Sequence, residues 1–255
     1  MLKFKLWKFV ASVAVLVAGA GRGEAATVSL ASLLTPGATL VSGDKVFSNF
    51  HNFTETGTAT PLGAANIFLT TISQPNRNLA DPTNWPLPPG QPACGLPLCA
   101  TEYGFRLSGD WDLTQNENYN FGLDYTVTAT GGCHIYANEI EITGNALNGE
   151  IDVTENVTSG PLTLAIKGAW VHDPGLDNTI DREYFTNSTN GLPICVDTAH
   201  ISMGIQLQAL NLVGAQASLE HVDVYFAQTI PEPSTYALLL LGSAGVGLMV
   251  RRKRS

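Results

Sequence analysis

The amino-acid sequence predicts an all-β fold, an antiparallel β-sandwich. Apolar and polar residues alternate along many short runs, glycine, asparagine and aspartate residues interrupt these runs, and no run has the spacing of an amphipathic helix. The clearest run places five apolar side chains on one face: Tyr119, Phe121, Leu123, Tyr125 and Val127. Such alternation is typical of a half-buried strand. Eight to ten short strands of this kind predict two packed sheets.

The N-terminal segment, residues 1–25, has the features of a secretory signal peptide. Three lysines precede a short apolar run at residues 9–20, and two small residues, Gly23 and Ala25, precede a cleavage site before Ala26. A membrane anchor kept in the mature protein is the alternative, but the apolar run is shorter than the ~20 residues that span a bilayer. We therefore expect the export machinery and signal peptidase to act on the chain.

Residues 26–229 are expected to form the β-sandwich ectodomain. Alternation recurs in eight further runs: residues 44–53, 65–72, 102–107, 134–142, 149–154, 162–170, 200–210 and 221–226. Residues 73–99, which include seven prolines, and the polar residues 172–195 interrupt this pattern and are predicted to be long surface loops. Such loops often carry binding sites, although irregular connections held by disulfides are the plainer interpretation.

Charge is distributed unevenly along the chain. Residues 27–230 hold 5 basic and 20 acidic residues, a net charge of −15, whereas the whole chain has a net charge of −9. An acidic surface repels the phosphate backbone of nucleic acids. The composition therefore argues against DNA or RNA as a partner.

All four cysteines, Cys94, Cys99, Cys133 and Cys195, lie in the part expected to be exported. An even number of cysteines in an oxidising compartment predicts two disulfides, for which three connectivities exist. The turn-forming sequence between Cys94 and Cys99 favours a bond between these two, which leaves Cys133 to pair with Cys195. A metal site at Cys133 and His134 is the alternative, but its spacing fits no closed zinc pattern.

Three tryptophans could offer flat rings to a sugar ligand. Trp85 is the best candidate because it lies among prolines in a predicted loop. Trp111 is a second candidate, whereas Trp170 ends an apolar strand and is expected in the core. A secreted carbohydrate-binding module is therefore one alternative for the function.

No catalytic set stands out in the sequence. The motifs G-x-S-x-G and H-E-x-x-H are absent, and 20 acidic residues nominate no particular carboxylate pair for glycoside hydrolysis. We expect a non-catalytic protein, with a polysaccharide hydrolase as a further alternative. No cofactor is expected, except that Asp173, Asp177 and Asp181 are weak candidates for calcium ligands. A solvated acidic loop is the simpler interpretation of these three residues.

The C-terminal segment, residues 230–255, is predicted to hold one transmembrane helix. Residues 236–250 are apolar and would form a helix about 22 Å long, which is short for a hydrocarbon core of roughly 30 Å. Flanking residues and snorkelling arginines extend this helix. A basic cluster follows and places the C-terminus in the cytoplasm: Arg251, Arg252, Lys253 and Arg254.

The same segment closely resembles the PEP-CTERM sorting signal of Gram-negative bacteria. The resemblance rests on the order of three features at the chain end, namely the apolar run, the basic cluster after it and the motif before it, Pro231, Glu232, Pro233, Ser234 and Thr235. It implies export across the inner membrane, transient anchoring by the C-terminal helix, and processing near the Pro-Glu-Pro motif by the membrane transpeptidase exosortase. It also implies a final place at the cell surface or in the extracellular matrix, and a link to exopolysaccharide and biofilm.

Overall fold

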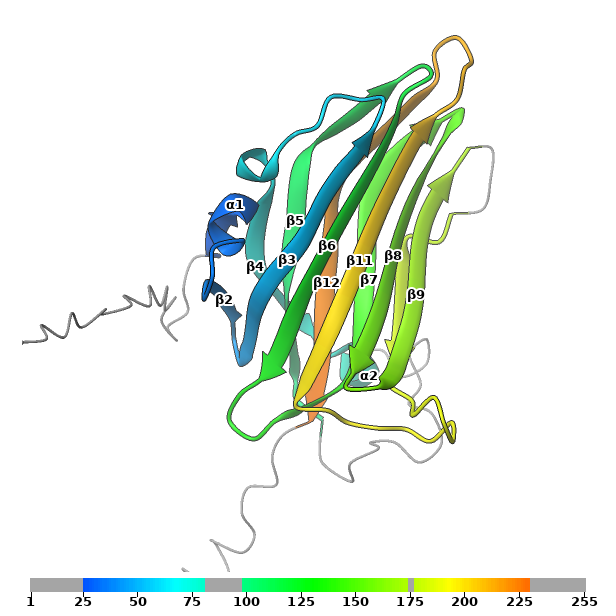
Figure 1. Ribbon diagram of the computed structural model, residues 1–255. Helices are drawn as coiled ribbons and strands as arrows, with labels where there is room; N and C mark the ends of the chain where they lie inside the picture. The colour runs from blue at the N-terminus through cyan, green and yellow to red at the C-terminus, as the bar shows by residue number, and fades with distance from the viewer. Residues whose placement is uncertain (1–24, 81–97, 174–176, 230–255) are drawn as a thin grey trace, which may run out of the picture.

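The computed structural model describes residues 25–80, 98–173 and 177–229. They form two antiparallel six-stranded sheets that pack face to face (Figure 1). The strand order in sheet A is β1 (Thr27–Ser29), β4 (Phe68–Pro75), β5 (Thr101–Thr114), β12 (Gln216–Thr229), β7 (His134–Leu147) and β10 (Ile180–Tyr184). The order in sheet B is β2 (Thr39–Ser42), β3 (Lys45–Gly57), β6 (Asn118–Ala129), β11 (Thr198–Ala209), β8 (Gly149–Ser159) and β9 (Leu162–His172). Three short helical segments accompany them, α1 (Leu30–Leu33), η1 (Ala64–Asn66) and α2 (Arg77–Ala80). The predicted antiparallel β-sandwich is confirmed.

The strands are more numerous and longer than the sequence predicts. The described residues contain twelve strands, and eight of them are 11 to 14 residues long, so the prediction of eight to ten short strands is wrong. Strand β5 continues past Leu107 through Asp110 to Trp111 and Leu113, which are buried. Polar residues on the solvent face of a sheet do not end a strand, and the buried apolar positions of β5 keep the same two-residue period from Phe105 and Leu107 to Trp111 and Leu113.

One of the two predicted loops contains a strand. Residues 180–184 within the loop predicted at 172–195 form β10, which pairs with β7 at the edge of sheet A. Its central residue is Arg182, which is buried and forms an ion pair with Glu102. Because this buried position is charged, the sequence shows no apolar alternation there. In the other predicted loop, residues 73–75 belong to β4 and residues 77–80 form α2, so the loop prediction is wrong there. Residues 81–97 lie outside the described residues.

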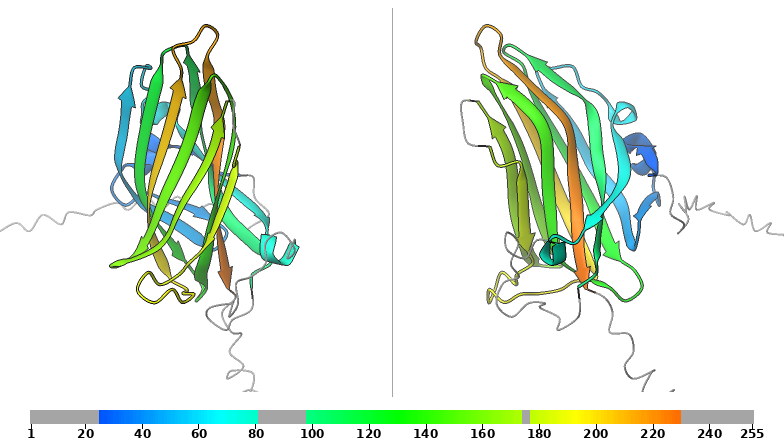
Figure 2. Two further views of the ribbon diagram at one scale, coloured as in Figure 1. Left: turned by 90° about the vertical axis from the view of Figure 1, so that its right-hand side faces the viewer. Right: turned by 180° about the vertical axis from the view of Figure 1, so that it is seen from behind.

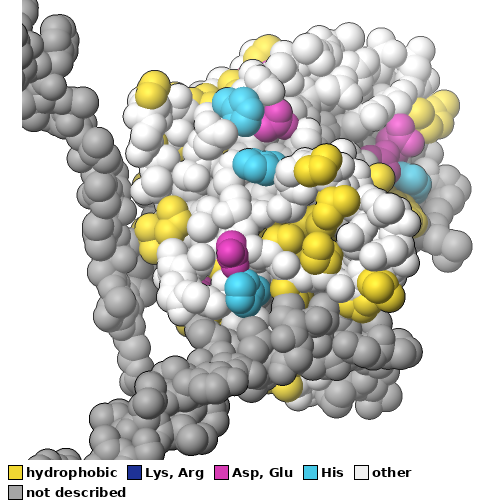
Figure 3. All heavy atoms as spheres, turned by 60° about the horizontal axis from the view of Figure 1, so that its bottom comes forward, with side chains coloured by type: hydrophobic (Ala, Val, Ile, Leu, Met, Phe, Trp, Pro, Cys, Tyr) yellow, Lys and Arg dark blue, Asp and Glu magenta, His cyan; other side chains and the backbone are white. Residues whose placement is uncertain are grey.

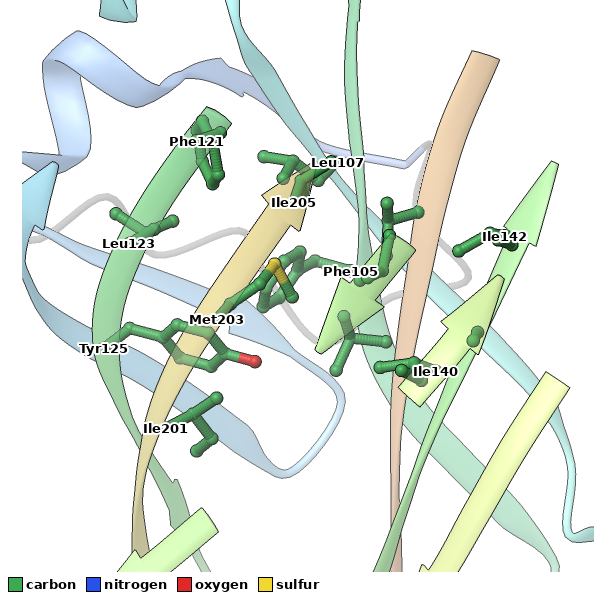
Figure 4. Close-up of a cluster of buried hydrophobic side chains, with 14 of the residues drawn as sticks. Phe105, Leu107, Phe121, Leu123, Tyr125, Ile140, Ile142, Ile201, Met203 and Ile205 are labelled. Atoms are coloured by element: carbon green, nitrogen blue, oxygen red, sulfur yellow. The ribbon is translucent and has the colours of Figure 1, made fainter. Parts of the chain in front are cut away.

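The main hydrophobic core fills the space between the sheets (Figure 4). Phe105 of sheet A stacks edge-to-face on Tyr125 of sheet B, with ring centroids 5.3 Å apart. The five apolar residues that the alternation of β6 placed on one face are all buried. That prediction is confirmed, and Trp111 is also buried, with only 3% of its surface exposed. Trp111 therefore cannot serve as a sugar platform, and that candidate is wrong.

A buried ion pair lies inside the sandwich. Lys167 Nζ of β9 is 2.5 Å from Glu155 Oε2 of β8, and both side chains are fully buried. Glu155 also accepts hydrogen bonds from the hydroxyl of Tyr125 at 3.1 Å and the amide of Asn138 at 2.8 Å. Burial lowers the pKa of Lys167, and the adjacent carboxylate opposes that shift. Three neighbours in hydrogen-bonding range compensate the buried charge of Glu155.

A second ionic network covers the outer face of sheet A and holds α2 against it. Arg182 donates to Glu102 at 2.7 Å and to Glu139 at 3.1 Å, and all three side chains are fully buried. Arg77 of α2 donates to Glu139 at 2.7 Å and to Glu141 at 2.8 Å. Burial raises the pKa of Glu141, and Arg77 opposes this effect. Figure 2 shows α2 at the end of the sandwich where β12 ends.

The structure leaves the predicted membrane segments untested. The helices of residues 25–80, 98–173 and 177–229 are all too short to cross a bilayer. The predicted signal peptide before residue 25 and the predicted transmembrane helix at residues 236–250 lie outside the described residues.

Candidate functional site

The outer face of sheet B carries a row of small residues that crosses five strands. Strand register aligns Thr54 of β3, Gly122 of β6, Gly204 of β11, Thr154 of β8 and Gly168 of β9 side by side. Successive strands are about 4.8 Å apart, so this row is about 19 Å long. We call it the glycine row. It runs perpendicular to the strands and carries no side chain larger than threonine.

The three glycines of this row are not needed for backbone conformation, since none has a positive φ. A methyl group on Gly122 would lie 2.6 Å from the hydroxyl of Thr54, which leans over it. A methyl group on Gly204 would lie 3.2 Å from the hydroxyl of Thr154. At Gly168 the nearest atoms are 3.8 Å away, so that position is open. Glycine inside a strand often marks a place where a ligand or another chain approaches the backbone closely.

Polar side chains border the glycine row on one side. Register places Asp124, Ser202 and Asn156 next to one another on β6, β11 and β8, and Ser202 and Asn156 are exposed. His51 and Asn52 of β3 lie at the end of this border, where the amide of Asn52 donates to Asp124 at 2.7 Å. These side chains present hydroxyl, amide and carboxylate groups to solvent.

The opposite border ends in an aromatic side chain. Asn120, Gln206 and Asp152 lie next to one another, and Trp170 of β9 follows Asp152 in register. The indole of Trp170 is partly exposed and lies beside Gly168, so it forms a wall at one end of the row. The expectation that Trp170 belongs to the core is therefore wrong. Its side chain is on the outer face because residues alternate and its neighbours Ala169 and Val171 point inward.

Beside Trp170 lies a group of potential metal ligands. His172 Nε2 is 2.9 Å from Asp152 Oδ1, and Glu150 lies close enough that one ligand atom of each of the three residues falls within 4.8 Å of the others. The ring of His172 is 6.4 Å from that of Trp170 and tilted by 31°. The hydrogen bond orients His172 at the end of the polar border.

Within the part of the chain that the structure describes, no Lys or Arg side chain borders the glycine row. The described residues contain five Lys and Arg side chains, and each is engaged in an ion pair elsewhere: Lys45 with Asp44, Arg77 with Glu139, Arg106 with Asp223, Lys167 with Glu155 and Arg182 with Glu102. Figure 3, seen from the lower end, shows histidine and acidic side chains among other polar groups and no Lys or Arg among the coloured atoms. Among the described residues this face therefore carries neutral polar, acidic and histidine side chains but no Lys or Arg.

Most of the site residues predicted from sequence fall outside the described residues. These are Trp85, Cys94, the motif at residues 231–235 and the basic cluster at residues 251–254. The three candidate calcium ligands are described but do not share one group of ligand atoms. Asp173, Asp177 and Asp181 each accept a hydrogen bond from a different backbone N–H, at 2.7, 3.2 and 2.8 Å. The calcium site stays an untested prediction.

The predicted disulfide pairing is wrong. Cys195 is disulfide-bonded, whereas Cys99 and Cys133 carry free thiols, so neither Cys94–Cys99 nor Cys133–Cys195 forms. Cys133 packs against the core between the sheets, whereas Cys195 packs against the small cluster around Tyr136. These two environments lie on opposite faces of sheet A, and sequence spacing does not reveal that.

Comparison with solved structures adds little. The chain is similar to the enzymatically active domain of bacteriophage CBA120 tailspike protein 4 (14% identity, TM-score 0.25), and the match covers 69% of this chain and 19% of that one. It is also similar to TmCBM61 in complex with β-1,4-galactotriose (9% identity, TM-score 0.23, 68% and 87% covered). A third match is the family 11 carbohydrate-binding module of Clostridium thermocellum in complex with a β-1,3-1,4-mixed-linked tetrasaccharide (10% identity, TM-score 0.19, 75% and 94% covered). Similarities this low support no conclusion about function.

Comparison at the sequence level is more specific. No curated protein matches the chain. A family model described as the PEP-CTERM protein-sorting motif matches residues 229–254, which begin at the last residue of β12. The match includes Pro231, Glu232 and Pro233 and the basic cluster. By its sorting motif, the chain is a PEP-CTERM protein.

Proposed function

We propose that this protein is a non-catalytic surface or matrix protein that exosortase sorts and that contacts extracellular polysaccharide through the outer face of sheet B. The sorting motif at residues 229–254 implies export, a membrane-anchored C-terminus and exosortase as the processing partner. Processing leaves the β-sandwich as the part that acts outside the cell. The observation that carries the ligand proposal is the glycine row with its polar borders.

The chemistry of the face fits a neutral polysaccharide. Sugar hydroxyls both donate and accept hydrogen bonds, and the borders offer both kinds of partner from Ser202, Asn156 and Gln206. Trp170 adds an apolar ring face at the end of the row, which suits the apolar face of a sugar ring. An anionic polysaccharide would meet the carboxylates of Asp124 and Asp152, which have the histidine neighbours His51 and His172 but no Lys or Arg among the described residues. When these histidines are neutral, the carboxylates repel an anionic polymer.

The shape of the face also favours an extended chain. A row about 19 Å long without large side chains lets a linear polymer lie along the threonine hydroxyls and approach the backbone closely at Gly168, which is open. Sheet B supports these groups, since β3, β6, β11, β8 and β9 are hydrogen-bonded neighbours and β6, β11 and β8 pair without a register shift. A preorganised surface spends little free energy on ordering side chains when it binds.

Affinity electrophoresis of the mature protein tests this proposal. Native gels with a neutral polysaccharide should retard the protein, and gels with an anionic one should not. Trp170→Ala should reduce the retardation, whereas Phe68→Ala should leave it unchanged. Phe68 is the matched control because it is an exposed aromatic residue of sheet A, with 41% of its surface exposed. Equal migration with and without neutral polysaccharides would contradict the binding proposal, and release of reducing ends would favour a hydrolase instead.

A further inference from the structure

Two free thiols meet at the end of the sandwich where β12 ends. The Sγ atoms of Cys99 and Cys133 and a carboxylate oxygen of Asp44 all lie within 4.8 Å of one another. Cys99 lies just before β5, and Cys133 lies in the turn between β6 and β7. The two residues are far apart in sequence but approach each other because sheet A places β5 and β7 on either side of β12.

These thiols lie on either side of the last residues of β12. The backbone N–H of Cys99 donates to the carbonyl of Gln228 at 2.9 Å. On the other side, His134, which follows Cys133, pairs in register with Thr229. Thr229 is the last residue of β12 and the first residue of the matched sorting motif. The sorting segment therefore leaves the sandwich between the two cysteine-bearing segments.

We propose that Cys99 and Cys133 form a disulfide in the exported protein and so fasten the two neighbours of β12 across the point where the sorting segment begins. The oxidant is a disulfide, of a protein or a small molecule, in the compartment into which the chain is exported. The thiolate of one cysteine attacks the donor and forms a mixed disulfide, and the second cysteine then displaces the donor sulfur. Overall, two thiols and one donor disulfide yield the Cys99–Cys133 bond and two donor thiols.

The position of the bond gives it a mechanical role. While the C-terminal segment anchors the protein, any pull on the body enters through Thr229. Backbone hydrogen bonds to Leu98 and Cys99 on one side and to β7 on the other resist the peeling of β12. A covalent link between these two flanking segments prevents them from separating when the hydrogen bonds break.

A metal site is the competing use of the same atoms, and the surroundings disfavour it. Lys45 is buried, and its ammonium group donates to Asp44 Oδ1 at 2.8 Å, so the carboxylate already has a cation. Burial raises the pKa of Cys133 to about 11 and also raises that of Cys99. The group also offers only three protein ligands among the described residues, whereas closed structural zinc sites have four.

Peptide mapping of the full protein recovered from the producing cells tests the bond. The protein is alkylated under denaturing conditions before any reduction, digested, and analysed by mass spectrometry. We expect a linked pair of peptides with Cys99 and Cys133, two hydrogens lighter than the sum of the two thiol peptides. The pair should be missing in a Cys99→Ser/Cys133→Ser variant, in which Cys195 should stay bonded.

Three outcomes would overturn the inference. They are alkylation of both Cys99 and Cys133 in the unreduced protein, a bond from either residue to another cysteine, and stoichiometric zinc whose removal by a chelator exposes both thiols. The inference depends on export but not on polysaccharide binding. A failure of the binding experiment therefore leaves the disulfide prediction intact, and the reverse also holds.

Discussion

Replacing Lys167 by methionine should destabilise the sandwich severely. Methionine keeps most of the length and the apolar stem of the side chain, so the change mainly removes the charge 2.5 Å from Glu155. Glu155 then stays buried with only the neutral donors Tyr125 and Asn138. Removing one partner of a buried ion pair costs about 3–5 kcal/mol of unfolding free energy. For a domain of about 200 residues this corresponds to a decrease in Tm of about 6–20 °C.

A double variant separates the unpaired charge from lost packing. Lys167→Met/Glu155→Gln removes both charges, and the new amide at position 155 needs an acceptor. Asn138 Oδ1 has no hydrogen-bond partner, so its amide can turn to accept that bond. We expect the double variant to recover more than half of the lost unfolding free energy in urea titrations. A single variant as stable as the wild type, or a double variant no more stable than the single one, would refute the reasoning.

Two further predictions concern pH and sorting. Burial raises the pKa of Tyr136 to about 12 from its usual 10.0, so the folded state resists ionisation. The stability that this group contributes should be complete below about pH 10 and decrease by about 2–3 kcal/mol as the pH rises to 12. Urea titrations at several alkaline pH values, with tyrosinate absorbance as a second probe, would show this, and constant stability over that range would disprove it. For sorting, Glu232→Ala should leave membrane insertion intact and block processing, whereas replacement of the basic cluster should weaken retention before processing. Mass spectrometry of the C-terminus from wild-type and exosortase-deficient cells distinguishes these, and an intact Ser255 in both would identify the segment as a plain anchor.

Alternation was a reliable guide to the strands that bury one apolar face. The prediction for β6 was confirmed because its inward positions are all apolar, and the same holds for Val222, Val224 and Phe226 of β12. It failed where a buried position is charged. Lys167 faces the interior of the sandwich, and Arg182 lies on the covered outer face of sheet A. The buried charge of each is compensated by acidic side chains from other strands. No local pattern predicts a contact of that kind.

The candidate site could not be predicted from the sequence for a similar reason. Gly122, Gly168 and Gly204 each stand alone in a strand sequence, and only the register of β6, β11, β8 and β9 brings them into one row. The available sequence signal for the site was glycine in the middle of a strand. Such a glycine weakens the strand and often marks a position that a ligand or another chain approaches closely. The predicted cysteine pairing was wrong because it relied on distance along the sequence. Which cysteines are close in space depends on the order of the strands in the sheets.

The most direct test of the proposed function is the affinity of a Gly168→Thr variant for a neutral polysaccharide. A side chain at position 168 fits without a clash, since the nearest atoms to an added Cβ are 3.8 Å away, and threonine favours strands. The variant should therefore keep its Tm. The new side chain obstructs the glycine row beside Trp170. The apparent affinity for the polysaccharide, measured from the gel retardation, should therefore decrease at least tenfold, about 1.4 kcal/mol of binding free energy. Ser73→Thr, at an exposed position of sheet A, should bind as the wild type does. Wild-type affinity in a folded Gly168→Thr protein would contradict the assignment of this face as the binding surface.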